Sequence, residues 1–250
     1  MIIIKNSEQI ALMKKAGRIT GEALLLARDI VRPGISTKEI DKKMHDFIIK
    51  CGATPSFLGY GGFPGSACIS INNEVIHGIP SDKKILCEGD IVKIDVGARY
   101  RGYNGDSART FAVGKVSDEA LRLISVTEQS FYEAMKFAKA GNRVGDIGCA
   151  VENFVISNGF SVVRAYVGHG VGAELHEEPS VPNYGRAGRG ARLYSGMTLA
   201  VEPMVNAGVE DVRVQKDGWT VTTADGKLSA HYENSICITE SDPILLTVVS

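Results

Sequence analysis

The feature that most constrains the fold is an internal similarity between two stretches that lie 107 residues apart. Gly34, before one helical segment, corresponds to Gly141, before another. The same offset carries residues 89–95 onto residues 196–202, and each of these stretches is a glycine, an apolar run typical of a strand, and then a carboxylate. A constant offset across both a helix and a strand favours a duplication over chance.

The two halves of this repeat, roughly 7–113 and 117–240, would pack around a pseudo-two-fold axis. A site on that axis would receive one carboxylate from each half. Periodicity predicts helices over about 7–31, from Ser36 or Thr37 to Gly52, over 117–140 and over 144–157, and strands at 66–72, 91–96, 107–113 and 197–202. This pattern indicates an α+β fold, with helices on one side of an antiparallel sheet in each half. No linker interrupts the chain, so residues 1–250 are expected to form one domain.

Composition limits the binding partners and the cellular compartment that we expect for this protein. The formal net charge is −1, which gives no electrostatic reason to expect nucleic acid or an anionic membrane as a partner. No apolar run approaches about 20 residues, and the apolar start of the chain is too short for a signal peptide. The five cysteines form no CxxC pair and are typical of reduced thiols, so we expect a cytoplasmic protein.

Four carboxylates occupy positions that suggest a shared site. Asp95 and Glu202 end the two repeat-related strands, Asp106 follows Asp95 across a turn, and Glu233 follows Glu202 after a longer hairpin. Asp95 or Glu202 alone is explained more simply as a strand-end acid in solvent or in a salt bridge, but that explanation weakens for a repeat-related pair. Clustered carboxylates repel one another in a low-dielectric pocket, and bound cations are the natural means of keeping them ionised.

The histidines refine the choice of metal. His169 lies in the segment Gly168-His169-Gly170, where a ligand can approach the backbone closely. Four carboxylates and one imidazole suit manganese, iron(II), cobalt or zinc, and two such ions about 3.5–4 Å apart are common in hydrolases. His45 is predicted to be a hydrogen-bonded structural or surface residue of a helix, and His231 has no assigned role.

The ordered set of candidate ligands resembles that of a known superfamily. It resembles the five metal ligands of the methionine aminopeptidases and creatinase-like "pita-bread" metallohydrolases. Residues 70–80 resemble the family's motif around its substrate-side histidine, and residues 103–111 resemble its motif around the second acid. Residues 168–172 together with 176–179 are similar to the type I signature. The resemblance covers residues 5–245 and is to the minimal bacterial type I form.

The resemblance implies a pita-bread fold and an activity. The activity is removal of the initiator methionine from nascent proteins with a small second residue, through attack by metal-activated water. Two divalent ions are implied, with Asp95 on one, His169 and Glu202 on the other, and Asp106 and Glu233 bridging both.

Roles in catalysis and substrate binding also follow from the resemblance. Glu202, His176 and His77 are the implied catalytic residues, and both histidines would contact the substrate. The methionine pocket would be lined by Tyr60, Phe63, Cys68 and Trp219, with Phe57 and Leu175 at its edges. Core packing is the simpler explanation of each aromatic residue taken alone, but Trp219, the chain's only tryptophan, lies near the ligands in the sequence and favours the pocket. The implied partner is the N-terminal peptide of nascent proteins, with proximity to the ribosome, no direct contact with nucleic acid or membrane, and a monomeric state.

Two alternatives remain open at this point. A Xaa-Pro dipeptidase or creatinase-like hydrolase usually carries a further N-terminal domain, for which the position of Asp95 leaves no room. A non-catalytic binding protein of the same fold would usually have lost ligands, whereas this chain keeps all five.

Overall fold

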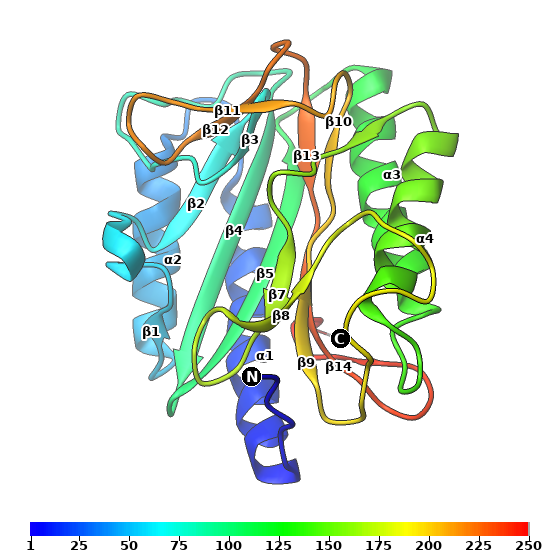
Figure 1. Ribbon diagram of the computed structural model, residues 1–250. Coiled ribbons are helices and arrows are strands. Elements are labelled where there is room, and N and C mark those ends of the chain that lie inside the picture. Colours follow the sequence, from blue (N-terminus) through cyan, green and yellow to red (C-terminus); the bar gives the residue numbers. More distant parts are fainter. Residues whose placement is uncertain (250) are drawn as a thin grey trace.

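A long antiparallel hairpin runs through the middle of the first half of the molecule (Figure 1). The computed structural model describes residues 1–249. The hairpin consists of β4 (Ile91–Tyr100) and β5 (Tyr103–Ala112). The two turn residues, Arg101 and Gly102, both have positive φ (47° and 88°). This conformation matches the twist of paired strands, so the hairpin closes with a two-residue loop.

The strands of the described residues are arranged in two larger and two smaller antiparallel sheets. The first large sheet has the order β1-β4-β2, with β5 on β4, and the second has the order β15-β14-β9-β7-β8. The smaller sheets are β13-β10-β6 and β11-β12-β3. The remaining strands are β1 (Thr54–Pro55), β2 (Ala67–Ile71), β3 (Glu74–Ile76), β6 (Ser161–Val162), β7 (Gly168–Gly170), β8 (Glu177–Val181), β9 (Thr198–Val201), β10 (Met204–Asn206), β11 (Val212–Val214), β12 (Val221–Thr223), β13 (Ser229–His231), β14 (Asn234–Cys237) and β15 (Ile244–Leu245).

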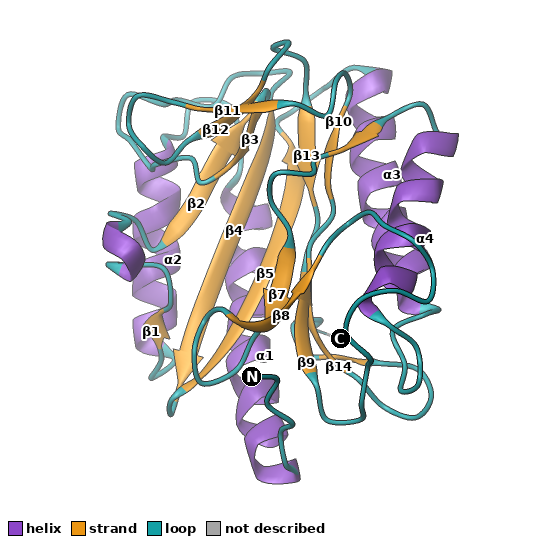
Figure 2. Ribbon diagram, viewed as in Figure 1, coloured by secondary structure: helices purple, strands orange, loops and turns teal. Residues whose placement is uncertain are grey.

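Two pairs of helices cover the strands, and Figure 2 shows them in purple. They are α1 (Ser7–Ile30), α2 (Thr37–Lys50), α3 (Asp118–Met135) and α4 (Val144–Ser157). Asn6 and Ser36 cap the first two, because their side chains accept hydrogen bonds from Gln9 N and Glu39 N. A short 3-10 turn, η1 (Tyr60–Gly62), follows β1.

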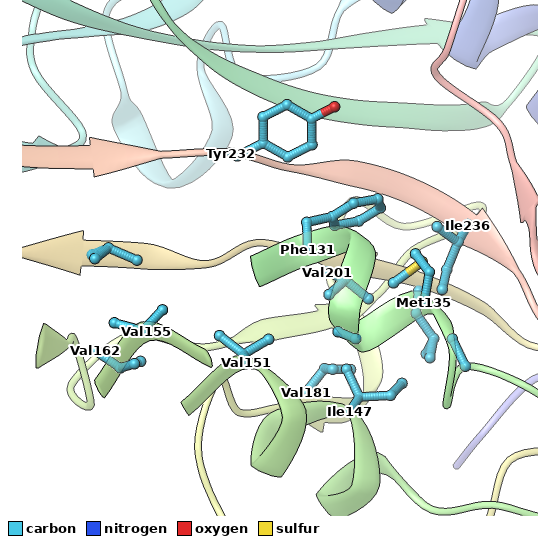
Figure 3. Packing of buried hydrophobic residues seen from close by; sticks show 14 of the residues in the cluster. Phe131, Met135, Ile147, Val151, Val155, Val162, Val181, Val201, Tyr232 and Ile236 are labelled. Carbon is cyan, nitrogen blue, oxygen red and sulfur yellow. The ribbon is translucent and has the colours of Figure 1, made fainter. Parts of the chain in front are cut away.

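Each pair of helices buries an apolar core against its own sheet. Behind the first sheet, residues of α1 and α2 such as Ile19 and Met44 pack with Val92 and Ile94 of β4. The second core lies between α3, α4 and the strands of the second half, where Phe131 points toward Tyr232 (Figure 3). The apolar faces of the helices are thereby removed from water, while the opposite sides of the sheets are left to build a site.

Buried hydroxyl groups join the two halves. Ser235 Oγ of β14 donates to Asp106 O and accepts from Asp106 N, both at 2.9 Å. Thr110 Oγ1 of β5 donates to His231 O and accepts from His231 N, also at 2.9 Å. Each hydroxyl thus satisfies both backbone groups of a residue on the other half, so β5 is held against the second half in one register.

The predicted fold class is confirmed, since helices and antiparallel sheets form an α+β structure. Helices α2 and α4 have the same length, 14 residues, and are separated by the offset of the sequence similarity, although the duplication itself stays a prediction. The predicted helix over 117–140 was too long and ends at Met135. Beyond this point Phe137 N and Ala138 N bond only three residues back, and Ala140 N bonds to Thr239 O, so the helical pattern is not continued. Within residues 1–249, no helix is long and apolar enough to cross a membrane.

Candidate metal centre

A cavity of about 240 Å³ lies where residues of both halves converge. Its walls bring together residues that are far apart in the sequence. They are Phe57, Tyr60, Gly61, Phe63, Cys68, His77, Asp95, Asp106, His169, Leu175, His176, Glu202, Trp219 and Glu233. Every residue that the sequence singled out for metal, substrate or catalysis therefore lines one cavity, and Gly61 is added to them.

The first two carboxylates come from the β4–β5 hairpin. In its register, Asp95 lies opposite Ala108 and Asp106 lies opposite Gly97. The two acids are therefore diagonal neighbours on the same face of the sheet, within reach of each other. The expectation that the hairpin returns Asp106 to the side of Asp95 is met by this geometry.

The other two carboxylates lie at a shared interruption of two paired strands. Strand β9 pairs with β14 and β10 pairs with β13, but Glu202-Pro203 and Tyr232-Glu233 between them leave the ladder. Tyr232 N donates to Pro203 O at 3.2 Å, whereas Glu233 N donates across to Ala108 O of β5 at 3.0 Å. This break turns both glutamates toward the β4–β5 hairpin.

The orientation of His169 is fixed by its own strand. Its Nδ1 lies 2.9 Å from Gly170 O, and a carbonyl can only accept, so Nδ1 carries the proton. The lone pair of Nε2 then faces Glu202 Oε1 at 3.5 Å and Asp106 Oδ2 at 3.9 Å. Gly170 permits this arrangement, because a Cβ there would lie 2.3 Å from Glu178 O.

The electrostatics of the cluster disfavour its negative charge. Burial, reinforced by the neighbouring carboxylates, raises the pKa values of Asp95, Glu202 and Glu233 well above their usual range. Burial also raises the pKa of Asp106 to about 7 and lowers the pKa of His169 to about 3. Among residues 1–249, the only basic side chains within ion-pair distance of these four acids are His169 and His231. Burial lowers the pKa of each to about 3, so neither ring supplies a positive charge at pH 7.

These observations fit a divalent cation. Asp95 Oδ1 and Asp106 Oδ1 are buried without a hydrogen-bond partner, which is costly unless another group compensates them. Ligand atoms of Asp106, His169 and Glu233 all lie within 4.8 Å of one another. Oxygen and imidazole donors that face each other with their lone pairs are what a borderline divalent ion requires.

One side of the cavity is apolar. Phe57, Phe63, Cys68 and Leu175 are buried together, and Trp219 packs edge-on to Phe63 with ring centroids 5.2 Å apart. Burial and the nearby carboxylates raise the pKa of the Cys68 thiol well above its usual value, so this group is a neutral part of the wall.

Two further histidines border the metal cluster and the apolar wall. His176 Nδ1 lies 2.8 Å from Tyr60 Oη, and its ring lies 4.1 Å from that of His169. His77 has positive φ (58°) and stands edge-on to Trp219 at 6.4 Å. Burial lowers the pKa of His176, and burial together with His176 lowers that of His77 to about 4, so both rings are neutral at pH 7.

The remaining histidines behave differently from each other. His45 lies on α2, away from the cavity, where its Nδ1 bonds Ser66 Oγ at 2.8 Å. His231, which the sequence left unassigned, is buried with Nε2 3.7 Å from Glu202 Oε2. Its position two residues before Glu233 was the only sequence signal for this contact.

Comparison with known proteins places the chain among metallopeptidases. The model of metallopeptidase family M24 matches residues 11–240. A methionine aminopeptidase of Clostridium acetobutylicum is 53% identical over 248 residues, which cover 99% of both chains, and methionine aminopeptidase 1 of Bacillus subtilis is 49% identical over the whole of both.

Solved structures agree with this relationship. Methionine aminopeptidase from Thermotoga maritima superposes with a TM-score of 0.98 at 44% identity, covering all of both chains. The prolidase from Pyrococcus furiosus reaches 0.80 at 25% identity, where the match covers 99% of this chain and 66% of the prolidase. The chain therefore belongs to metallopeptidase family M24, and the relatives named above that match it over their full length are methionine aminopeptidases.

Proposed function

We propose that this enzyme removes the initiator methionine from nascent proteins whose second residue is small. The observation that carries the proposal is that a single cavity joins the carboxylate–histidine cluster to an apolar, aromatic wall. A methionine side chain fits such a wall chemically, because its thioether packs favourably against aromatic rings. The full-length relatives named methionine aminopeptidases support the same substrate.

Five side chains are proposed to hold two divalent ions: Asp95, Asp106, His169, Glu202 and Glu233. Four carboxylates offer two oxygens each and His169 offers one nitrogen, which is more than a single small ion coordinates. The donor types favour manganese, iron(II), cobalt or zinc. When bound, such ions would polarise a peptide carbonyl and lower the pKa of a bound water molecule.

The protein's own residues position the substrate and move the proton. Glu202 accepts a proton from the attacking water and delivers it to the leaving amine, since bound cations would keep this carboxylate ionised and able to accept the proton. With Tyr60 donating its hydroxyl proton to His176 Nδ1, the proton of the imidazole resides on Nε2. His176, assisted by His77, then donates a hydrogen bond to the oxyanion as it develops.

The proposed preference for a small second residue rests on the small volume of the cavity, about 240 Å³. The apolar wall would hold the methionine side chain and leave limited room beyond the scissile bond. Cleavage before arginine or tryptophan as readily as before alanine would contradict this part of the proposal.

Hydrolysis of Met-Ala-Ser by metal-stripped protein is the direct test. Manganese, iron(II), cobalt or zinc should restore release of methionine, while Leu-Ala-Ser should remain intact. Release of the residue before a proline would instead indicate the activity of the prolidase relatives. No release with any metal, despite metal binding measured by calorimetry, would indicate a binding protein with this fold.

The cellular setting is part of the same proposal. A substrate that is the N-terminus of a nascent protein calls for an enzyme in the cytoplasm, close to the ribosome. We expect a monomer that uses its cavity without a partner subunit. Sedimentation of the purified protein alone and with ribosomes tests both expectations.

A further inference from the structure

His231 is a buried residue whose imidazole has no partner. It ends β13 and is 1% exposed, and neither ring nitrogen forms a hydrogen bond. Desolvating a polar ring without such a bond is unfavourable, so an isolated structural histidine is a poor explanation for this position.

The backbone of His231 cannot move to relieve this situation. Its N–H and C=O are both bonded to Thr110 Oγ1, and the strand register places it opposite Met204. The ring is consequently held on the side of the strand that faces Glu202, with Nε2 3.7 Å from Glu202 Oε2.

The carboxylate of Glu202 lies between two imidazoles. Its Oε1 is 3.5 Å from His169 Nε2, and its Oε2 is 3.7 Å from His231 Nε2. His169 Nε2 has a lone pair, because its proton is on Nδ1, so Oε1 is on the side where a cation would bind. His231 has no such constraint, and its Nε2 can carry the proton of a neutral ring.

We propose that His231 is a positioning residue that donates a hydrogen bond from Nε2 to Glu202 Oε2 and so orients Glu202 between metal and substrate. This inference rests on the proposed function and gives the two oxygens of Glu202 separate environments. The present 3.7 Å separation is longer than a hydrogen bond, and catalytic hydrogen bonds commonly shorten when the reacting complex forms. Groups that orient a metal-binding carboxylate typically change metal affinity or activity by about 10- to 100-fold when removed.

The test compares His231→Met with His231→Gln. Methionine removes the donor, whereas glutamine keeps an N–H donor of comparable reach. We expect kcat for Met-Ala-Ser to fall about 10- to 100-fold in His231→Met with KM within about twofold, and to stay within about threefold of wild type in His231→Gln. His45→Met, the same substitution on α2 away from the cavity, serves as the control and should leave kcat unchanged.

Two readouts separate positioning from a structural role and do not depend on turnover. Cobalt(II) binding to the stripped protein, followed by calorimetry and visible absorption, should weaken about 10-fold in His231→Met and little in His231→Gln. The unfolding midpoint of the metal-free His231→Met protein should equal or exceed that of wild type, since an unpartnered polar ring is replaced by an apolar side chain.

The proposal is overturned if His231→Met keeps both its kcat and its cobalt affinity, or if His231→Gln loses as much as His231→Met. It is also overturned if the metal-free His231→Met protein is destabilised in parallel with its losses. A wild-type protein that releases no methionine would refute the proposed function, while the cobalt titrations would still decide the role of His231.

Discussion

Replacement of Lys5 by methionine should destabilise the protein far more than replacement of an ordinary surface lysine. Lys5 precedes α1 and its ammonium is paired with the carboxylate of Glu177, with side-chain exposures of only 3% and 5%. The ammonium also donates to Ile3 O at 3.2 Å. Glu177 directly follows His176, so the pair fastens the start of the chain to the cavity wall.

The magnitude follows from the burial of both partners. Methionine keeps the aliphatic length of Lys5 but leaves Glu177 buried without its counter-charge. Removing one partner of a buried pair typically destabilises a protein by roughly 3–5 kcal/mol. At about 2–4 °C per kcal/mol for a domain of this size, the unfolding midpoint should fall by roughly 6–20 °C.

Calorimetric and urea unfolding of the metal-free protein would measure this change without a contribution from metal binding. Lys42→Met is the matched control, because Lys42 pairs with Asp46 at 71% and 58% exposure and should contribute less than about 1 kcal/mol. The double variant Lys5→Met/Glu177→Met should regain most of the loss, since no charge then remains buried. A loss below about 1 kcal/mol for Lys5→Met, equal to that of the control, would refute the reasoning.

Three further predictions concern the cluster and its surroundings. The pKa values of Asp106 and the other three carboxylates are raised in the folded state, so the native protein retains protons that the unfolded chain has lost. The metal-free protein should therefore become less stable from pH 6.5 to pH 8. Manganese should reverse this loss, and a midpoint that rises with pH in metal-free buffer would contradict it. Gly97→Ala should destabilise by about 1–3 kcal/mol in urea unfolding, because its Cβ would lie 2.8 Å from Ser56 Cβ, and Ser56→Gly should relieve part of this loss. Iodoacetamide at pH 7.5 should label exposed Cys87 and spare Cys68, since burial raises the pKa of the Cys68 thiol. Mass spectrometry of peptides would measure the labelling, and equal labelling of the two cysteines would refute the burial of Cys68.

Local patterns were sufficient for most elements of the fold. The glycine, apolar run and carboxylate ending at Asp95 predicted a strand, and that strand is present as part of β4. Its length was underestimated, because the hairpin extends to a two-residue turn whose positive φ values at Arg101 and Gly102 the composition of the turn did not reveal. The end of α3 was also missed, because the backbone beyond it bonds to Asn142 and Thr239 rather than continuing the helix.

The sequence by itself determined the candidate ligands and their order along the chain. A carboxylate that ends an apolar strand is recognisable locally, and the repeat indicated that Asp95 and Glu202 belong together. Periodicity and spacing describe distances along one element, so they can identify such residues without knowing how the halves pack.

Only the tertiary structure decided which polar atoms face one another. The interruption at Glu202 and Glu233, the bond between Tyr60 and His176, and the approach of His231 to Glu202 all arise where segments distant in sequence are packed together. These contacts depend on the docking of β5 against the second half through buried hydroxyl groups, and a hydroxyl residue in a sequence does not indicate its partner. The residue types that give the site its chemistry are thus recognisable from local sequence, whereas the orientations of their side chains are set by the packing of the two halves.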